Sequence, residues 1–247
     1  MTHLVTINRK SVKRAGGRFL SEDPLVCVVD DFLTPDECAH FRQLGEGRLK
    51  RAKVAGGPTA DVSDVRTNFN CWIEHRETLK TRTVSSKIAK LLGMPREHAE
   101  KFQLIHYPVS TEYQPHMDTF DPFRDEGKPY FARGGQRLVT ALAYLNDVED
   151  GGATEFVEMD LQVAAKAGRL LIFYNCGEGT TTPHPKARHA GTPVLQGEKW
   201  AFNLWFREAP VTQTIVPSRG ANTFTGTKTT TVGGVLMQNQ GSSKRQR

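Results

Sequence analysis

Cysteine is scarce in this sequence, and the four cysteines form no motif. Cys27, Cys38, Cys71 and Cys176 lie far apart, and no two of them have the C-x-x-C spacing of zinc sites or thioredoxin-like redox centres. Two disulfides would be possible, but the N-terminus lacks an export signal. We therefore expect four free, buried thiols and no cysteine-based metal or redox chemistry.

Long hydrophobic runs are also absent. No apolar stretch approaches the ~20 residues that a membrane-spanning helix requires. Residues 1–20 lack the apolar core and cleavage site of a secretory signal, and residues 243–247 do not form an endoplasmic-reticulum retention signal. With 247 residues, 38% hydrophobic and 24% charged, the composition is typical of a globular protein with a sizeable core. We expect a cytoplasmic protein without a membrane partner.

Acidic residues are missing from both ends of the chain. Residues 1–20 contain five basic residues, and residues 211–247 contain five more, so residues 21–210 hold 23 basic and 27 acidic residues. We interpret residues 1–22 as a basic flexible leader and residues 211–247 as a basic, largely disordered tail, in which Val232 to Met237 could add a strand. The basic residues are sparse and accompany no aromatic stacking platform, which argues against a nucleic-acid partner.

Residues 23–100 have the patterns of a supporting layer. The apolar run 25–30 predicts a strand, and a second strand is expected over 68–73. Residues 34–44 begin with threonine, proline and two acidic residues, which is the composition of a helix start. Residues 78–92 have apolar residues at helical spacing and are followed by glycine, which predicts a second helix.

From residue 102 to residue 206 the chain consists of short β-rich runs separated by glycine, proline and aspartate. This pattern predicts an antiparallel sandwich or barrel and not a βαβ fold. The expected strands are 102–107, 112–118, 137–145, 154–156, 169–174, 188–191 and 199–207.

His116 and Asp118 are two residues apart in one of these expected strands. In an extended chain such residues point to the same face, so an imidazole and a carboxylate lie side by side. They could supply two of the three ligands of a metal site. Taken alone, the pair could equally be the polar face of a sheet.

Among the other histidines, His189 stands out because a long strand follows it. Residues 199–206 alternate, so that large apolar side chains share one face while Lys199 and Trp205 share the other. A lysine on an inward face needs an anionic partner, either a protein carboxylate or a bound carboxylate ligand. The remaining candidates for a third metal ligand are His3, His40, His75, His98, His106 and His184.

Two histidines and one carboxylate suit non-heme Fe(II) that activates oxygen. The same residues could hold zinc, but the H-E-x-x-H helix motif of many zinc hydrolases is absent. An iron site with open positions can accept a 2-oxo acid, and Lys199 could neutralise the far carboxylate of that co-substrate.

Several separated segments resemble one known family in their order and spacing. The chain is similar to the iron- and 2-oxoglutarate-dependent dioxygenases of the collagen-type prolyl 4-hydroxylase family, over roughly residues 24–208. The segments that carry the resemblance are Arg66-Thr67, 103–107, 113–118, 135–147, 151–156, 168–173 and 189–205.

The resemblance implies a mainly β fold, a double-stranded β-helix or jelly roll supported by N-terminal helices. Its domain would span residues 23–210, with the jelly-roll core at about 100–208. The family's iron ligands correspond to His116, Asp118 and His189, and its 2-oxoglutarate-binding lysine corresponds to Lys199.

Further residues follow from the resemblance alone. Tyr107, Thr140 and Trp205 match positions that line the co-substrate pocket, and Tyr113 matches an aromatic residue that meets the substrate proline. Arg124 and Arg133 are candidate substrate contacts. The sequence departs from the family pattern at Ser110, where glycine is usual, and at Ala165, where proline is usual.

The resemblance implies Fe(II), 2-oxoglutarate, O₂ and the reductant ascorbate as cofactors and co-substrates. It also implies hydroxylation of a proline in a peptide or protein, with conversion of 2-oxoglutarate to succinate and CO₂. The peptide-binding domain of the animal collagen enzymes is missing, which argues against collagen itself as the substrate. Residues 120–133 follow the metal ligands directly and could form a mobile lid.

The sequence is also compatible with other functions. A free amino acid or another small molecule could be the substrate. Asp118 argues against a halogenase, which would leave that ligand position vacant, and Lys199 argues against nucleic-acid demethylases, which would anchor 2-oxoglutarate with arginine. A jelly-roll binding protein with a vestigial metal site is the non-enzymatic alternative, and the oligomeric state is undetermined.

Overall fold

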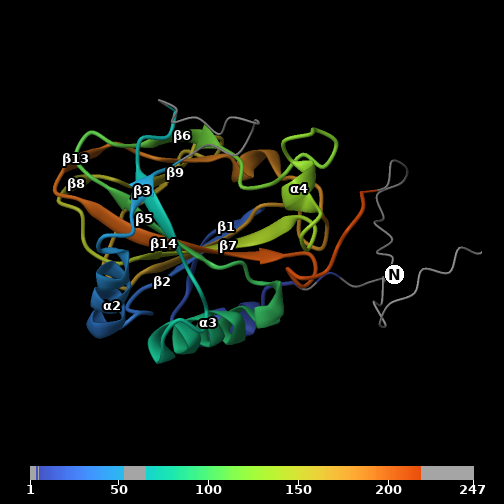
Figure 1. The fold of residues 1–247 in the computed structure, drawn as a ribbon, viewed down its shortest axis with the longest axis horizontal. Coiled ribbons are helices and arrows are strands. Elements are labelled where there is room, and N and C mark those ends of the chain that lie inside the picture. The colour runs from blue at the N-terminus through green and yellow to red at the C-terminus, as the bar shows by residue number, and fades with distance from the viewer. Residues whose placement is uncertain (1–3, 5, 53–64, 218–247) are drawn as a thin grey trace, which may run out of the picture.

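The computed structural model describes residues 4, 6–52 and 65–217, and Figure 1 shows how their helices and strands are arranged. In chain order they are α1 (Arg9–Arg14), β1 (Arg18–Glu22), β2 (Leu25–Val29), α2 (Pro35–Gly45), β3 (Lys50–Arg51), β4 (Phe69–Ile73), α3 (Leu79–Leu92), η1 (Arg96–His98), β5 (Phe102–Tyr107), β6 (Tyr113–His116), α4 (Lys128–Phe131), β7 (Arg137–Tyr144), β8 (Asp150–Gly151), β9 (Thr154–Phe156), β10 (Leu161–Val163), β11 (Leu170–Tyr174), η2 (Pro185–Ala187), β12 (His189–Gly191), β13 (Val194–Gln196) and β14 (Lys199–Arg207).

Two antiparallel sheets face each other and form the jelly roll that the sequence predicts. The larger sheet has the strand order β1-β2-β11-β7-β14-β5-β4-β3, and the smaller one has the order β10-β9-β12-β6. Between them lies a core of buried side chains from both sheets, including Tyr107, Leu142, Phe156 and Phe173. The space between the sheets therefore holds both packed apolar residues and, at one end, the site described below.

Helices α2 and α3 cover the opposite face of the larger sheet (Figure 1). Phe41 of α2 packs against Phe102 and Phe202, with ring centroids 4.9 and 4.6 Å apart respectively. Apolar residues of α3, among them Ile88 and Leu92, join the same core. The helices thus support the sheet that carries one wall of the site.

Both long helices begin and end where the sequence predicts. Thr34 and Glu37 form a reciprocal capping box at the start of α2, and Thr78 caps α3 together with Thr81. Helix α3 ends at Gly93, which has φ +71°, a left-handed conformation that glycine adopts without the steric cost of a Cβ.

The expectation of a flexible leader is wrong for residues 6–22. This segment forms α1 and β1, and β1 pairs with β2 at the edge of the larger sheet. Val12 is fully buried, and Arg9 forms ion pairs with Glu22 and Glu178. The charge pattern hid this, because the acidic partners of Arg9 lie at the end of the segment, at Glu22, and far away in the chain, at Glu178.

The expected strand 112–118 is shorter in the structure. Strand β6 ends at His116, and Asp118 lies in the bend that follows. The short strands β1, β3, β8, β10 and β13 were not predicted.

Residues 211–217 of the tail pack against the loop that follows the metal-binding pair. Ile215 is 4% exposed and packs with Phe131 and Ala209, and Thr214 forms a β-bridge with Arg133. The possible strand from Val232 to Met237 lies outside the described residues. Within the described part of the chain, all four cysteines are free and buried as expected, and no helix is long and apolar enough to cross a membrane.

Candidate metal centre and active site

His116, Asp118 and His189 come together at one end of the space between the sheets. Strands β6 and β12 are neighbours, and His116 lies directly opposite His189 in their register. Ligand atoms from the three residues lie within 4.8 Å of one another. The Nε2 atoms of His116 and His189 are 3.8 and 3.7 Å from the Asp118 carboxylate oxygens Oδ1 and Oδ2.

Each histidine is oriented by its second ring nitrogen. Nδ1 of His116 donates to the Gln114 carbonyl at 2.9 Å, and Nδ1 of His189 donates to the Ala187 carbonyl at 3.0 Å. These bonds leave both Nε2 atoms as bases that face Asp118, which is the arrangement of metal-binding histidines.

Asp118 is 8% exposed, and its carboxylate is held by two neutral donors. Oδ2 accepts hydrogen bonds from the Thr140 hydroxyl at 2.7 Å and the Trp205 indole at 2.8 Å. Thr140 and Trp205 are cross-strand partners on β7 and β14, which explains why both reach the same oxygen.

The protonation states suit a cation. Burial acts to raise the pKa of Asp118, but the neighbouring imidazoles of His189 and His116 outweigh it and lower that pKa. Burial and the nearby His189 lower the pKa of His116. An ionised carboxylate beside a neutral imidazole is the form in which these groups bind metals, so the donors present fit Fe(II).

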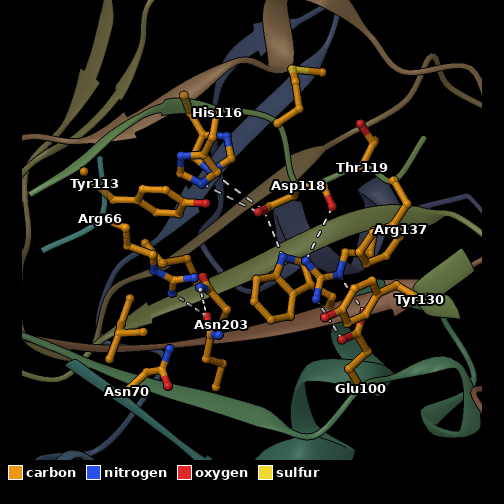
Figure 2. Close-up of a pocket in the computed structure, with 18 of the residues that line it drawn as sticks. Arg66, Asn70, Glu100, Tyr113, His116, Asp118, Thr119, Tyr130, Arg137 and Asn203 are labelled. Atoms are coloured by element: carbon orange, nitrogen blue, oxygen red, sulfur yellow. Dashed lines mark hydrogen bonds and ion pairs between the residues drawn. The ribbon is translucent and has the colours of Figure 1, made fainter. Parts of the chain in front are cut away.

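The three residues line a cavity of about 1260 Å³. Figure 2 shows Tyr113 and Arg66 to one side of Asp118, and Arg137, Glu100 and Tyr130 to the other. The cavity reaches Lys199 on β14 and Tyr107, its partner on β5. A co-substrate therefore has room beside the metal ligands.

Lys199 is a buried cation without an acidic partner among the described residues. It is 2% exposed, and its Nζ lies 5.1 and 5.5 Å from the ring centroids of Tyr107 and Tyr144. Burial lowers its pKa to about 7. A structural salt bridge, one of the two explanations for Lys199, is not present in the part of the chain that the structure describes.

The other predicted pocket residues lie in two places. Tyr107 and Trp205 line the cavity, whereas Thr140 is bonded to Asp118 and is not among the lining residues. Thr154, which the sequence reasoning missed, does line the cavity, and its hydroxyl lies 2.7 Å from that of Tyr144. Thr154 lies within the family-like segment 151–156, so membership of that segment was the sequence signal that could have identified it as a pocket residue.

Tyr113 stacks on the metal-binding histidine His116, with ring centroids 3.5 Å apart. The Arg66 guanidinium lies over the Tyr113 ring, 4.5 Å from its centroid. Arg124 and Arg133 line the outer part of the cavity, and Arg124 pairs with Asp121 at 3.3 Å. The structure thus gathers the candidate substrate contacts around one opening.

A charged network that the sequence did not reveal supports Trp205. The Arg137 guanidinium lies 3.5 Å from the Trp205 ring centroid, and its Nε is 2.6 Å from the Glu100 carboxylate. Arg207 joins the same carboxylate at 2.5 Å. Burial acts to raise the pKa of Glu100, but the two guanidinium groups outweigh it and lower that pKa.

Comparison with known proteins gives a consistent result. The 2OG-Fe(II) oxygenase superfamily profile matches residues 102–207. Prolyl 4-hydroxylase 2 of Arabidopsis thaliana is 31% identical over 222 residues, which cover 81% of this chain and 71% of that protein. Human prolyl 4-hydroxylase subunit alpha-3 is 32% identical over 192 residues, covering 75% of this chain but only 34% of the subunit.

The fold has solved counterparts. The viral collagen prolyl hydroxylase of Paramecium Bursaria Chlorella virus-1, solved as a 2OG complex, superposes with a TM-score of 0.58 at 24% identity, over 74% of this chain and 95% of that one. Together with the His-Asp-His cluster and the buried Lys199, these relatives show that the chain belongs to the prolyl 4-hydroxylase family of 2OG-Fe(II) oxygenases.

Proposed function

We propose that this protein is an Fe(II)- and 2-oxoglutarate-dependent hydroxylase of proline residues in peptides. The observation that carries the proposal is the pairing of a three-residue metal cluster with an isolated buried lysine in one cavity. The relatives named prolyl 4-hydroxylase supply the substrate class.

In this proposal each side chain has a distinct task. His116, Asp118 and His189 hold Fe(II), and the hydroxyl of Thr140 and the indole of Trp205 fix the Asp118 carboxylate. When bound, iron and 2-oxoglutarate supply the oxidation: O₂ and 2-oxoglutarate are consumed, succinate and CO₂ leave, and one substrate C–H becomes C–OH.

Lys199 binds the far carboxylate of 2-oxoglutarate. The lysine is buried, so the charge pair that it forms would be little screened by solvent. Tyr107 lies opposite Lys199 in the sheet register and narrows the same end of the cavity. These residues orient the co-substrate and keep water from its carboxylate.

Tyr113 borders the substrate side, with its ring against His116 and beneath the Arg66 guanidinium. An aromatic side chain next to the metal cluster suits the apolar pyrrolidine ring of proline, which would meet the exposed edge of Tyr113. Ascorbate is the proposed reductant that restores Fe(II) after uncoupled turnover.

The test is incubation of the protein with Fe(II), 2-oxoglutarate, ascorbate and a panel of proline-containing peptides. We expect succinate release together with a mass increase of one oxygen atom on proline. His189→Ala should abolish both products, because it removes a metal ligand. His106→Ala is the matched control, since His106 stacks on Trp200 outside the cavity lining.

Two results would contradict the proposal. Turnover by His189→Ala would mean that the metal cluster is not the catalytic site. Succinate release with no hydroxylated peptide, but with a hydroxylated free amino acid, would retain the oxygenase chemistry and refute the peptide substrate.

A further inference from the structure

The lining of the cavity is rich in basic residues, although residues 21–210 as a whole are not. Ten basic but only four acidic residues line the cavity, whereas residues 21–210 as a whole hold 23 basic and 27 acidic residues. The basic charge is therefore concentrated in this cavity, where Arg66, Lys199 and Arg207 are buried and other basic residues lie nearer its opening.

The carboxylates of the lining neutralise only part of this charge. Glu100 is held by Arg137 and Arg207, and Asp118 belongs to the metal cluster. Asp121 pairs with Arg124, and Glu126 is exposed.

Three cations at the mouth form no ion pair within the part of the chain that the structure describes: Lys50, Arg51 and Arg133. Lys50 and Arg133 are exposed, and Arg51 is half-buried, with its guanidinium bonded to the Thr67 carbonyl. By contrast, the neighbouring Arg48 and Lys101 pair with glutamates.

These three cations lie on opposite sides of the metal cluster. Lys50 and Arg51 form β3, the edge strand of the larger sheet, and Lys50 is the register partner of Asn70. Arg133 follows α4 directly. Figure 1 shows β3 and α4 far apart across the molecule, and Figure 2 shows Asp118 between Asn70 and Tyr130 of α4.

We propose that the preferred substrates are peptides with acidic residues on both sides of the target proline, and this inference rests on the proposed function. An extended peptide that places its proline at Tyr113 would cross the mouth, with one flank near Lys50 and Arg51 and the other near Arg133. Carboxylates on the two flanks would supply the anions that these cations lack.

A peptide fits better than a nucleic acid. His189 and Asp118 are only 7% and 8% exposed, so the reacting atom must descend to a recessed site. A single side chain on an extended peptide can do so. The cations also stand at two separate ends and do not follow a continuous backbone track, which is what nucleic-acid grooves provide.

The test compares three peptides that share one central proline: one with aspartate on both flanks, one with asparagine, and one with lysine. With the holoenzyme at low salt, we expect kcat/KM for the aspartate peptide to exceed that for the asparagine peptide about tenfold, and the lysine peptide to be poorest. The preference should shrink at high salt, because exposed charges are screened.

Charge-reversal variants locate the effect. Lys50→Glu and Arg133→Glu should each lower the ratio of kcat/KM for the aspartate peptide to kcat/KM for the asparagine peptide about fivefold. Peptides with aspartate on one flank only should respond to one variant and not to the other. Lys10→Glu is the control, because Lys10 is an exposed cation on α1 outside the cavity lining.

Equal turnover of the three peptides would overturn the charge preference and leave prolyl hydroxylation intact. If none is hydroxylated, the proposed function and this inference both fail. A single-stranded oligonucleotide is then tested as an inhibitor of turnover beside a non-hydroxylatable aspartate peptide. If the oligonucleotide inhibits more strongly, and Lys50→Glu abolishes that inhibition, the mouth binds nucleic acid and the inference is overturned.

Discussion

At the scale of single residues, Asp118 is the most constrained side chain of the site. Its Oδ2 accepts two hydrogen bonds, from Thr140 and Trp205, while Oδ1 faces His116. Both donors are neutral, so they orient the carboxylate without cancelling its charge. The geometry therefore keeps a full negative charge available for a cation between the two histidines.

Replacing Thr140 by valine should weaken metal binding. The change removes one of the two donors to Asp118 at nearly constant volume, so the carboxylate loses part of its orientation. We expect Fe(II) affinity, measured by anaerobic titration, to fall about 10- to 100-fold. Thr140→Ser, which keeps the hydroxyl, should restore most of it. Equal affinity in the valine and wild-type proteins would contradict this role.

The titration of Lys199 should make 2-oxoglutarate binding depend on pH. In the free protein burial lowers its pKa to about 7, so the lysine is charged below that pH and largely neutral above it. A bound carboxylate requires the charged form, so binding above that pH must take up a proton. We expect affinity to be nearly constant below about pH 7 and to fall up to about tenfold per pH unit above it.

Anaerobic calorimetry on the metal-loaded protein across this pH range measures the slope. Lys199→Met should bind 2-oxoglutarate more weakly, and the slope should vanish because no titrating group remains at that position. Parallel slopes in the two proteins would show that another group causes the pH dependence.

At the scale of elements, β14 joins the core to the site through its alternation. Phe202, Leu204 and Phe206 belong to the core under the helices, while Lys199 and Trp205 line the cavity. One strand thus fixes the cation and the indole relative to each other. A packing defect on its apolar face is transmitted to the other face, because the backbone is shared.

Phe202→Ala should destabilise the protein strongly. The ring is fully buried and packs against Phe41 and Phe102, so its removal leaves a cavity between α2 and the sheet. We expect the free energy of unfolding, measured by urea denaturation, to fall by about 3–5 kcal/mol. Leu195→Ala, at a residue that is 62% exposed, should change it by less than about 0.5 kcal/mol. Similar effects in both variants would contradict this view of the core.

At the scale of the whole molecule, the site is divided between the two sheets. His116 and His189 belong to the smaller sheet, whereas Thr140, Trp205 and Lys199 belong to the larger one. A metal and a co-substrate bound between them would contact both sheets at once. Ligand binding should therefore stabilise the entire fold and not one segment of it.

Metal and 2-oxoglutarate together should raise the melting temperature. At about 100 times the dissociation constant, the expected stabilisation is about 2.7 kcal/mol, or roughly 5–10 °C for a domain of this size. Differential scanning calorimetry with anaerobic Fe(II) checks this, and a chelator should reverse the shift. His189→Ala should show little of it. An equal shift in that variant would place binding elsewhere.

Local patterns were sufficient for much of the fold. The capping residues of α2 and α3, and the alternation along β14, act over a few neighbouring residues, and the structure has these elements at the expected positions. The ligand set also depended on short motifs and on their family-like order. The helix caps and the strand alternation are determined by residues close together in the chain, whereas the ligand set also needed the order of distant segments.

The remaining features depend on contacts between distant segments. Arg9 forms ion pairs with Glu22 and with the distant Glu178, and these pairs attach the basic leader to the rest of the fold. The Thr140 hydroxyl donates to Asp118 beside the Trp205 indole because β7 pairs with β14. Thr154 lines the same cavity as Lys199.

The sequence by itself determined the two long helices, many of the strands and the chemical types at the centre: two histidines, one aspartate and one lysine. Only the tertiary structure decided that Lys199 is buried without an acid beside it in the described part of the chain. It also decided that Lys50, Arg51 and Arg133, which form no ion pair within the described residues, line the same cavity on a body with more acidic than basic residues. The physical reason is that burial and ion pairing depend on which distant segments fold against each other, and no local pattern records that.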